Sequence, residues 1–394
     1  MRHVGIVGAG ISGLALAALL CSDGWRVTVL ERSNDDGPVG AGFMLQQLGQ
    51  QVADRLGIGA ALLAGSSPIR TVDGRRLDGR PTMQVRYDDV VPGVMAWGVH
   101  RSTLFDLLHG TANDAGAQVV PDFEVQHVER RGARGWTVRS ATGQHEGPFD
   151  LLVGADGASS QVRRLAFSAQ MDRPYPWGAL WAIVPDPTRS LGSALVQRWG
   201  GTRITLGLMP TGVAHASIFW SIRARDIERA IAAGPQAFID LAAPIAGSCA
   251  PLVEEVARTG LLGARYRDVV VRVPVQEGAV LVGDAAHAMS PQLGIGASMG
   301  LADAWTLAWA LREYPHDSRD ALAEYVRQRA RHVRYYRWLS MLMTPVFQSG
   351  LTPIAPARDL GLVGLSHNAF AQRQMVSTLM GERTSPWSRW ALPG

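Results

Sequence analysis

The sequence predicts an α/β protein in which a parallel sheet carries ligand-binding turns and a separate antiparallel sheet stands beside it. Two observations indicate the parallel sheet: a β-branched amino-terminal strand that enters a glycine-rich turn, and two later apolar strands that each lead into a turn containing Gly and Asp. The third observation is a change of period in residues 177–222, where apolar and polar residues alternate as in antiparallel strands.

The amino-terminal turn has the pattern G-x-G-x-x-G between a strand at residues 3–7 and an apolar helix at residues 14–20. Gly8 permits the tight turn, Gly10 lets a ligand approach the backbone, and Gly13 lets the helix pack closely on the strand. Such a turn directs backbone N–H groups and the positive end of the helix at phosphates. It therefore predicts a site for a dinucleotide.

The second strand, at residues 25–30, supports the same prediction because it ends at an acidic residue. Glu31 stands where a carboxylate can hold the two hydroxyl groups of a ribose, and Arg32 follows it. The order strand, turn, helix, strand and acid is more specific than the glycine pattern alone. We expect an adenine dinucleotide at this turn.

Composition limits the classes of function. The chain has 394 residues, of which 47% are hydrophobic, and its 38 basic residues are all arginine, so no mechanism that needs a lysine is open to it. The arginines are spread along the chain, which gives no indication of a nucleic-acid partner. Cys21 and Cys249 lie far apart and indicate neither a metal site nor a disulfide framework; this pattern favours a reducing, cytoplasmic location.

We expect no secretory signal and no integral membrane segment. The amino-terminal apolar run is interrupted by the glycine turn. Residues 338–357 are uncharged and long enough to span a bilayer, but Pro345, Pro353 and Pro356 would break a spanning helix. This stretch is predicted to be buried or to form a lid.

Local patterns predict the remaining elements. Residues 43–56 have helical spacing, residues 70–95 form short strands broken at Asp73-Gly74 and Asp78-Gly79, and a helix begins near Ser102. Residues 226–241 and about 318–343 are predicted helices. The second of these carries five arginines that we expect on a solvated face: Arg327, Arg329, Arg331, Arg334 and Arg337.

Two turns are predicted at the carboxyl ends of buried strands, where ligands bind in open α/β sheets. The strand at residues 150–154 leads to Asp156, Gly157 and Arg163, and the strand at residues 279–282 leads to Gly283 and Asp284. Each aspartate could bind a ligand or merely cap its turn.

The alternating segment 177–222 predicts an antiparallel meander with turns near Gly200 and Gly212. Four tryptophans lie in it: Trp177, Trp181, Trp199 and Trp220. They could line an aromatic cavity, although aromatic residues in such a sheet more often form core.

Together the amino-terminal turn, the Asp156 segment and the Gly283 segment resemble the class A, single-component FAD-dependent monooxygenases, the family of para-hydroxybenzoate hydroxylase. The resemblance covers about residues 1–315. It implies a discontinuous Rossmann-type FAD-binding domain with an inserted antiparallel-sheet substrate domain and C-terminal helices. The implied bounds are 1–69, 98–172 and 265–320 for the FAD-binding domain, 70–97 and 173–264 for the substrate domain, and 321–394 for the C-terminal helical region.

The resemblance and the turns together assign residues to FAD. These are Gly8, Gly10, Gly13, Glu31, Arg32, Arg101, Asp156, Gly157, Arg163, Gly283, Asp284, Pro291, Gly294, Gly296 and Ala297. A helix beginning near Ala297 would direct its positive end at the flavin pyrimidine ring, which favours reduced flavin. The sequence departs from the family at Gln46-Gln47, where a Pro-Asn pair is common, and at Ile295 and Ser298, where glutamine and asparagine are common.

For the substrate pocket we expect Trp97, Trp181, Trp220, His215 and Pro291. No catalytic residue can be named. A general base would need a pKa near neutrality, and the histidines near the expected pocket are His100, His215 and His287. A packing role is the simpler interpretation of His287.

The implied activity is hydroxylation of an aromatic or polycyclic small molecule with O2, through a flavin C4a-hydroperoxide. Because the chain has no second dinucleotide turn, NADPH or NADH would dock transiently to reduce the flavin. Two alternatives stay open: a related enzyme that is fed by a partner reductase or reduces a double bond, and a flavin-fold binding protein without turnover. We expect a monomer or homodimer.

Overall fold

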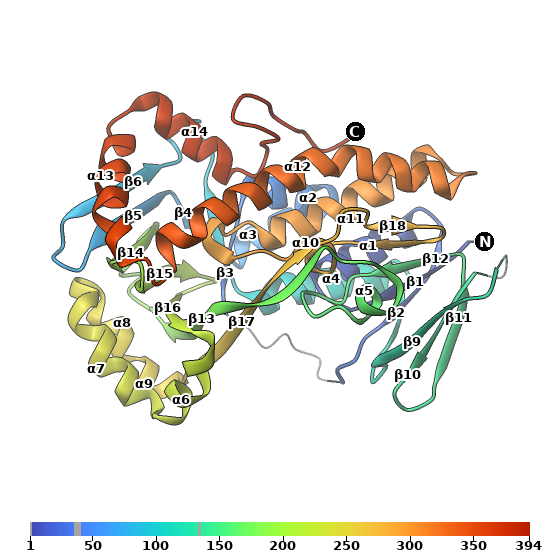
Figure 1. Ribbon diagram of the computed structural model, residues 1–394, viewed down its shortest axis with the longest axis horizontal. Coiled ribbons are helices and arrows are strands. Elements are labelled where there is room, and N and C mark those ends of the chain that lie inside the picture. The colour runs from blue at the N-terminus through green and yellow to red at the C-terminus, as the bar shows by residue number, and fades with distance from the viewer. Residues whose placement is uncertain (1, 35–40, 133–134) are drawn as a thin grey trace.

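The computed structural model describes residues 2–34, 41–132 and 135–394. A six-stranded sheet lies at the amino-terminal side of the molecule, with the spatial order β18-β19-β12-β1-β2-β8 (Figure 1). Its strands are β1 (His3–Val7), β2 (Arg26–Leu30), β8 (Gln118–Val120), β12 (Leu151–Gly154), β18 (Val275–Gln276) and β19 (Ala279–Leu281). All neighbours are parallel except β18 and β19, so the predicted parallel sheet is confirmed.

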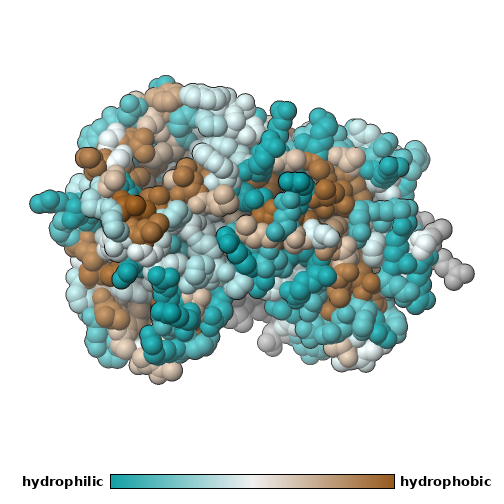
Figure 2. All heavy atoms as spheres, viewed as in Figure 1, coloured by the Kyte–Doolittle hydropathy of each residue, from teal (hydrophilic) through white to brown (hydrophobic). Residues whose placement is uncertain are grey.

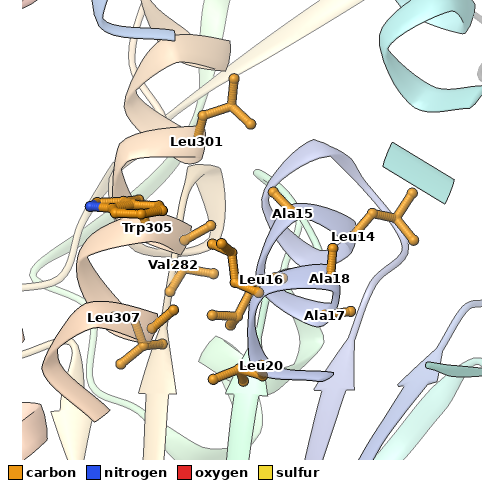
Figure 3. Packing of buried hydrophobic residues seen from close by; sticks show 14 of the residues in the cluster. Leu14, Ala15, Leu16, Ala17, Ala18, Leu20, Val282, Leu301, Trp305 and Leu307 are labelled. Carbon is orange, nitrogen blue, oxygen red and sulfur yellow. The ribbon is translucent and has the colours of Figure 1, made fainter. Parts of the chain in front are cut away.

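Both faces of this sheet are covered, which explains why its strands are apolar throughout. Helices α1 (Ile11–Ser22), α4 (Arg101–Asp114) and α11 (Gly296–Glu313) share one core with it. Figure 3 shows Leu16 of α1 lying between its own helix and α11, near Val282. A second core lies between the six-stranded sheet and a three-stranded antiparallel sheet. The strands of this smaller sheet are β9 (Val125–Arg130), β10 (Trp136–Ser140) and β11 (His145–Phe149).

The predicted antiparallel meander is confirmed as part of a seven-stranded sheet with the order β17-β13-β16-β15-β14-β5-β6. The meander consists of β13 (Met171–Pro185), β14 (Ala194–Gly200), β15 (Ile204–Thr211) and β16 (His215–Arg223). Strand β17 (Leu262–Val270) pairs with β13, and β5 (Thr71–Arg76) pairs with β14 and with β6 (Pro81–Arg86). Chain segments far apart in the sequence thus form one sheet.

One predicted turn in this region is wrong. Asp73-Gly74 lies inside β5, where a Cβ on Gly74 would stand 2.3 Å from the Trp199 ring. Gly74 therefore makes room for an indole and does not end a strand. The other prediction, at Asp78-Gly79, is confirmed because Gly79 has a φ of +81° between β5 and β6.

Short helices cover one face of the seven-stranded sheet: α6 (Ile227–Ala232), α7 (Gly234–Ala246), α8 (Ala250–Glu254) and α9 (Val256–Thr259). The stretch Gly234–Glu254 is long and apolar enough, by length and composition only, to cross a membrane. Here it is interrupted at Gly247, which has a φ of +61°, and its apolar residues pack on the sheet. The predicted single helix at residues 226–241 is likewise divided at Gly234.

The carboxyl-terminal helices are α12 (Ser318–Phe347), α13 (Ala355–Ser366) and α14 (Ala369–Leu379). Helix α12 runs from the six-stranded sheet to the seven-stranded sheet, where α13 and α14 lie beside β6 (Figure 1). The end of α12 places Phe347 against Trp199. The stretch beginning at Trp338 thus packs partly on the seven-stranded sheet.

A small sheet formed by β3 (Phe43–Leu45), β4 (Ser67–Ile69) and β7 (Ala96–Val99) joins the two larger ones. Along the chain, helices α2 (Gln47–Arg55) and α3 (Gly59–Ala64) come between β3 and β4. The helix predicted over residues 43–56 is therefore wrong at its start, because β3 pairs with β7.

Candidate flavin site

The first turn has the shape that its glycines predict. Gly8 has a φ of +104°, and a Cβ on Gly13 would lie 2.0 Å from the carbonyl oxygen of Gly8. Among the described residues, a Cβ on Gly10 would meet nothing within 4 Å and no side chain caps the amino terminus of α1. The turn therefore leaves open space in front of free backbone N–H groups, as a diphosphate requires.

Glu31 lies beside this turn. Its carboxylate accepts hydrogen bonds from the backbone N–H groups of Ala9 at 2.7 Å and Ser33 at 3.1 Å. The carboxylate is thereby held at the end of β2, where a ribose would lie. Arg32 lies after β2 and Arg101 begins α4, and both side chains are exposed. The cap of α4 is His100, which accepts from Ser102 N–H, so the helix begins one residue before Ser102, close to its predicted start.

Asp156 caps a helix. Its carboxylate accepts hydrogen bonds from Ser160 Oγ and from the N–H groups of Gln161 and Val162 at the start of α5 (Gln161–Ala166). Burial raises the pKa of this carboxyl group, while these donors oppose the rise. Asp156 thus shapes the turn, and the neighbouring Gly157 faces open space at a φ of +72°.

Arg163 holds two segments together. Its guanidinium is buried, pairs with Asp172 at 2.8 Å and donates to the carbonyl oxygens of Ala158 and Ala285. These acceptors hold the guanidinium of Arg163 between the two segments, and the cofactor contact implied by the resemblance stays a prediction. Arg163 fastens α5 against α10 (Asp284–His287).

The Gly283 turn meets the first turn, although 270 residues separate them in the chain. Gly283 has a φ of +59°, and a Cβ there would lie 2.5 Å from Ser12 Oγ. Asp284 begins α10 with an exposed side chain, and its carboxylate makes no hydrogen bond or ion pair within the described ranges. That carboxylate is free to accept from a hydroxyl group of a ligand.

The loop after α10 leads into the amino terminus of α11. Pro291 begins a 3-10 turn, Gly294 is left-handed with a φ of +58°, and α11 starts at Gly296, one residue before the predicted Ala297. In the part of the chain that the structure describes, no side chain caps α11, and a Cβ on Gly296 would meet nothing within 4 Å. The positive end of this 18-residue helix therefore faces open space.

The two departures from the family pattern meet beside this loop. Ser298 Oγ accepts a hydrogen bond from Gln46 N–H, and the Gln46 amide oxygen accepts from Tyr87 OH at 3.2 Å. The buried Gln46 Nε2 has no hydrogen-bond partner among the described residues. This polar group adjoins β3, which lies next to the Gly294 loop through Met44.

A buried charge cluster supports the Gly283 turn from behind. Asp303 accepts from Gly283 N–H at 2.7 Å, lies 2.6 Å from His287 Nε2 and pairs with Arg329. Burial alone would raise the pKa of Asp303, but Arg329 and His287 hold it below its usual range. The packing role expected for His287 is confirmed, whereas the solvated position predicted for Arg329 is wrong.

The sheet face that looks toward the carboxyl-terminal helices bears an aromatic group. The Trp181 and Phe219 rings lie 5.3 Å apart, and Trp181 Nε1 donates to Tyr266 OH at 3.3 Å. On the same face Ser217 Oγ accepts from Gly42 N–H at 3.1 Å, which brings the β3 region against the sheet. The sequence alone does not indicate Phe219 and Tyr266, because only the strand register shows that they meet Trp181.

The other expected pocket residues do not join this group. Trp220 lies on the opposite face, where its ring meets Phe238 of α7 at 6.0 Å. Trp97 packs against the core of the six-stranded sheet. His215 is exposed at the start of β16 and bonds to the carbonyl oxygen of Val213.

Two glutamines connect the loop at Pro291 to the aromatic sheet face. Gln292 Nε2 donates to Gln348 Oε1 at 3.0 Å, and Gln348 Nε2 donates to the carbonyl oxygen of Gly178 at 3.1 Å. Gly178 lies on β13 between Trp177 and Trp181. The site thus combines a dinucleotide turn, a free carboxylate and a helix terminus with an aromatic surface, which defines a flavin-dependent enzyme of two linked sheets.

Comparisons with known proteins identify the family. The family described as "FAD binding domain" matches residues 1–336, so this chain belongs to it and FAD is its cofactor. The chain is 28% identical to aurachin C monooxygenase/isomerase of Stigmatella aurantiaca, with 96% of each protein covered. It is 28% identical to kynurenine 3-monooxygenase of Stenotrophomonas maltophilia, covering 86% of this chain and 78% of that protein.

Solved structures share the fold. Klebsiella pneumoniae HpxO, complexed with FAD and uric acid, is 22% identical with a TM-score of 0.81, covering 96% of this chain and 97% of that one. A tetrameric form of 2-methyl-3-hydroxypyridine-5-carboxylic acid oxygenase is 23% identical with a TM-score of 0.78, covering 96% of both chains.

Proposed function

We propose that this protein is an FAD-dependent monooxygenase that uses NAD(P)H and O2 to hydroxylate a small aromatic or polycyclic molecule. The observation that carries the proposal is the hydrogen-bonded link from the Pro291 loop through Gln348 to Gly178. This link ties the loop that would border the flavin to β13, the strand that carries Trp181 beside Phe219. Planar rings on that face would stack against a planar substrate.

The relatives support this class of substrate. Two of them are named as monooxygenases, one of which acts on kynurenine, and HpxO holds uric acid together with FAD. A fourth relative is an oxygenase of a pyridine carboxylic acid. All these named compounds contain a planar ring.

The described residues suit each part of FAD. The turn at Gly10 would bind the diphosphate, Glu31 the adenosine ribose and Asp284 the ribitol chain. The open amino terminus of α11 would stabilise negative charge on the pyrimidine ring. When bound, FAD would accept a hydride from NAD(P)H and activate O2.

The chain's own residues orient the substrate and exclude water. Burial raises the pKa of Tyr266 to about 12, so its hydroxyl group stays protonated at neutral pH and donates to a polar atom of the substrate. Trp181 donates to the same oxygen and thereby fixes its direction. Neither residue is a base at neutral pH, so we assign no general base.

Anaerobic mixing with NADPH and then with NADH tests the function. We expect the visible flavin absorbance to bleach with at least one of them, faster in the presence of an aromatic substrate. Subsequent oxygen uptake should match formation of hydroxylated product. Bleaching only with an added reductase would favour the partner-fed enzyme, and a protein that never takes up FAD would favour a binding role.

Two further properties belong to this proposal. The free cysteines Cys21 and Cys249 favour a cytoplasmic location. We propose a monomer or homodimer, which light scattering of the FAD-loaded protein would distinguish from a tetramer such as the pyridine carboxylic acid oxygenase forms.

A further inference from the structure

Large apolar side chains are exposed where the carboxyl-terminal helices leave the core. Fifteen large hydrophobic residues are exposed among those that the structure describes, and six of them lie within residues 338–365. These six form what we call the carboxyl-terminal apolar surface: Trp338, Met341, Leu342, Leu351, Leu360 and Leu365. Figure 2 shows hydrophobic residues over α13 and the carboxyl-terminal end of α12 on the same face of the molecule. Exposed apolar groups that gather in this way mark a surface for a partner or a membrane.

The fold determines which side of α13 is exposed. Arg358 lies on the buried side, where its Nη1 donates to the carbonyl oxygens of Gly201 at 2.8 Å and Val346 at 3.3 Å. Leu360 follows two residues later, on the opposite side of the helix, and is 76% exposed. The other exposed residues along this side carry no charge: Ala357, Gly361 and Gly364. Helix α13 therefore presents an uncharged stripe outward because Arg358 anchors its other side.

The carboxyl-terminal apolar surface has no exposed charge within it. Between residues 338 and 372 only Arg358 and Asp359 are charged. These two side chains pair with each other and are 2% and 14% exposed. Water therefore meets apolar and uncharged groups along this whole stretch.

Positive charge borders the surface. Residues 321–394 contain nine arginines and three acidic residues, whereas the formal net charge of the whole chain is only +4, so this region carries all of the excess positive charge. Arg331 and Arg334 of α12 and Arg373 of α14 are exposed. Their guanidinium groups make no hydrogen bond or ion pair with any residue that the structure describes. These charges are therefore available to negative groups outside the protein.

The charged and apolar residues of α12 follow one another along a single stripe. Spacings of three or four residues place these side chains on one side of the helix: Arg331, Arg334, Trp338, Met341 and Leu342. Along the helix the order is cation, then indole, then aliphatic side chain. A membrane interface has the same order, because cations bind the headgroups, tryptophan prefers the boundary and aliphatic groups enter the acyl chains.

A second copy of the chain fits this surface less well than a lipid bilayer does. In a two-fold dimer the surface would meet itself and bring two basic borders together. The three acidic residues of this region cannot compensate them, because each is already engaged. Glu324 pairs with Arg327, Asp359 pairs with Arg358, and Glu382 accepts a hydrogen bond from Gln51. Anionic phospholipids provide the missing negative charge together with an apolar phase.

We propose that the carboxyl-terminal apolar surface docks on an anionic lipid bilayer, with Arg331 and Arg334 binding the phosphates. Docking is peripheral, since the other side of α12 stays packed in the protein through Tyr336, Ser340 and Thr344. The proposal goes beyond the proposed function, because adsorption to lipid requires no turnover.

Flotation of the FAD-loaded protein with lipid vesicles tests the proposal. The vesicles contain phosphatidylglycerol and phosphatidylcholine in equal amounts, or phosphatidylcholine alone. We expect partitioning into the anionic vesicles to be at least about tenfold stronger, since each arginine near such a surface contributes about fivefold. Raising the salt concentration from about 0.1 M to about 1 M shortens the Debye length from about 10 Å to about 3 Å and should remove this preference. Equal partitioning into both kinds of vesicle, or none into either, would overturn the proposal.

Paired substitutions separate the two components of binding. Arg331→Gln combined with Arg334→Gln should weaken partitioning into anionic vesicles more than about tenfold. Arg225→Gln is the charge control, since Arg225 is exposed just before α6 and should retain wild-type partitioning. Leu342→Ser combined with Leu360→Ser should weaken partitioning at least about tenfold through loss of buried apolar area.

Leu241→Ser is the apolar control, because Leu241 on α7 is 65% exposed but lies outside the carboxyl-terminal apolar surface. It should partition like the wild type, and flavin content and melting temperature should confirm that every variant is folded. If the controls lose as much partitioning as the substitutions in the surface, the proposed docking face is wrong.

Sedimentation velocity without vesicles examines a second copy as the occupant. We expect Leu342→Ser combined with Leu360→Ser to leave the mass of the FAD-loaded protein unchanged. A dimer that these two substitutions dissociate would overturn the assignment to lipid and make the surface a contact between copies. Flotation with anionic vesicles by a protein that shows no substrate-coupled oxygen uptake would refute the monooxygenase and support the lipid surface.

Discussion

Arg329 and Asp303 form an ion pair in the protein interior, with Nε 2.6 Å from Oδ1 and side chains that are 3% and 0% exposed. The other oxygen of Asp303 accepts from the N–H group of Gly283. The pair therefore connects α12 with the turn that carries Asp284. The guanidinium of Arg329 on α12 thus supports the candidate flavin site from the protein interior.

Replacing Arg329 by methionine should lower the free energy of unfolding by about 3–5 kcal/mol, because the Asp303 charge would stay buried without its partner. Urea unfolding of the apoprotein measures this change. Arg331→Met, an exposed position on the same helix, should change the stability by less than about 0.5 kcal/mol. Equal effects of the two substitutions would contradict the role of the buried pair.

Protonation of His332 should make the protein less stable as the pH is lowered. Its Nε2 bonds to the carbonyl oxygen of Gly381 and its Nδ1 to Arg329, which can only donate, so Nδ1 accepts and the ring is neutral. Burial and then the Arg329 charge hold the pKa of His332 well below 6.5. Below pH 6.5 the imidazole of His332 therefore binds a proton in the unfolded chain but stays neutral in the folded chain.

The free energy of unfolding should therefore decrease by up to about 1.4 kcal/mol per pH unit as pH falls from 6.5 toward the lower folded-state pKa of His332. Unfolding curves at pH 7.5, 6.5 and 5.5 test this slope. His332→Gln keeps both hydrogen bonds and should flatten it. His316→Gln, at an exposed position, should leave the slope unchanged.

Two glycines of the first turn should respond differently to alanine. Gly13→Ala should destabilise the apoprotein and abolish FAD binding, because its Cβ would lie 2.0 Å from the carbonyl oxygen of Gly8. Gly10→Ala should change apoprotein stability by less than about 1 kcal/mol, since its Cβ meets no protein atom within 4 Å. It should still weaken FAD binding at least tenfold by occupying the space of the diphosphate. Flavin fluorescence titration and thermal melting separate these outcomes.

Asp284→Asn should raise the dissociation constant for FAD about tenfold, through loss of a charge-assisted hydrogen bond to a ribitol hydroxyl group. Apoprotein stability should change by less than about 0.5 kcal/mol, because the side chain is exposed. Asp303→Asn is the informative comparison, since it should destabilise the apoprotein itself. Unchanged FAD affinity in Asp284→Asn would remove this residue from the site.

Two tryptophans on opposite faces of one sheet provide a test of the pocket. Trp181→Phe should raise KM several-fold, because it removes the N–H group that orients Tyr266. Trp220→Leu should leave KM unchanged and lower stability by about 1–3 kcal/mol through lost packing on Phe238. Steady-state oxygen uptake with a turned-over substrate, combined with melting curves, measures both. A rise of KM in Trp220→Leu alone would reverse the assignment of the faces.

Local patterns were sufficient to predict the shape of the first glycine turn. Gly8, Gly10 and Gly13 are needed where backbone and ligand approach closely, and Glu31 follows its strand at a distance set by the local βαβ unit. Such requirements involve neighbours in the chain, so they are visible in the order of residues. The alternation in residues 177–222 likewise predicted antiparallel strands, because the period of two is a local property.

Other features were decided by contacts between distant segments. Arg329 has the same local setting as the exposed Arg331, and only its position opposite Asp303 makes it a buried structural residue. Trp181 and Trp220 are equally aromatic, but the register of β13 and β16 places one toward Tyr266 and the other toward α7.

The sequence by itself therefore determined the class of cofactor site and the types of sheet, because glycine conformation and side-chain period are local. Tertiary structure alone decided which arginines are buried, which face of the meander is aromatic and where unpaired positive charge gathers. Those properties depend on burial and charge pairing, and both arise from residues that the fold brings together across hundreds of positions in the chain.

The surface in Figure 2 illustrates this dependence. On the face shown in Figure 2, hydrophobic residues form separate groups on both lobes, with hydrophilic residues between them. The polar link between α12 and the loop at Pro291 is recognised only from contacts between segments that are distant in the chain. The order of residues determined the conformation of the glycine turns, and the tertiary structure determined which side chains lie opposite them.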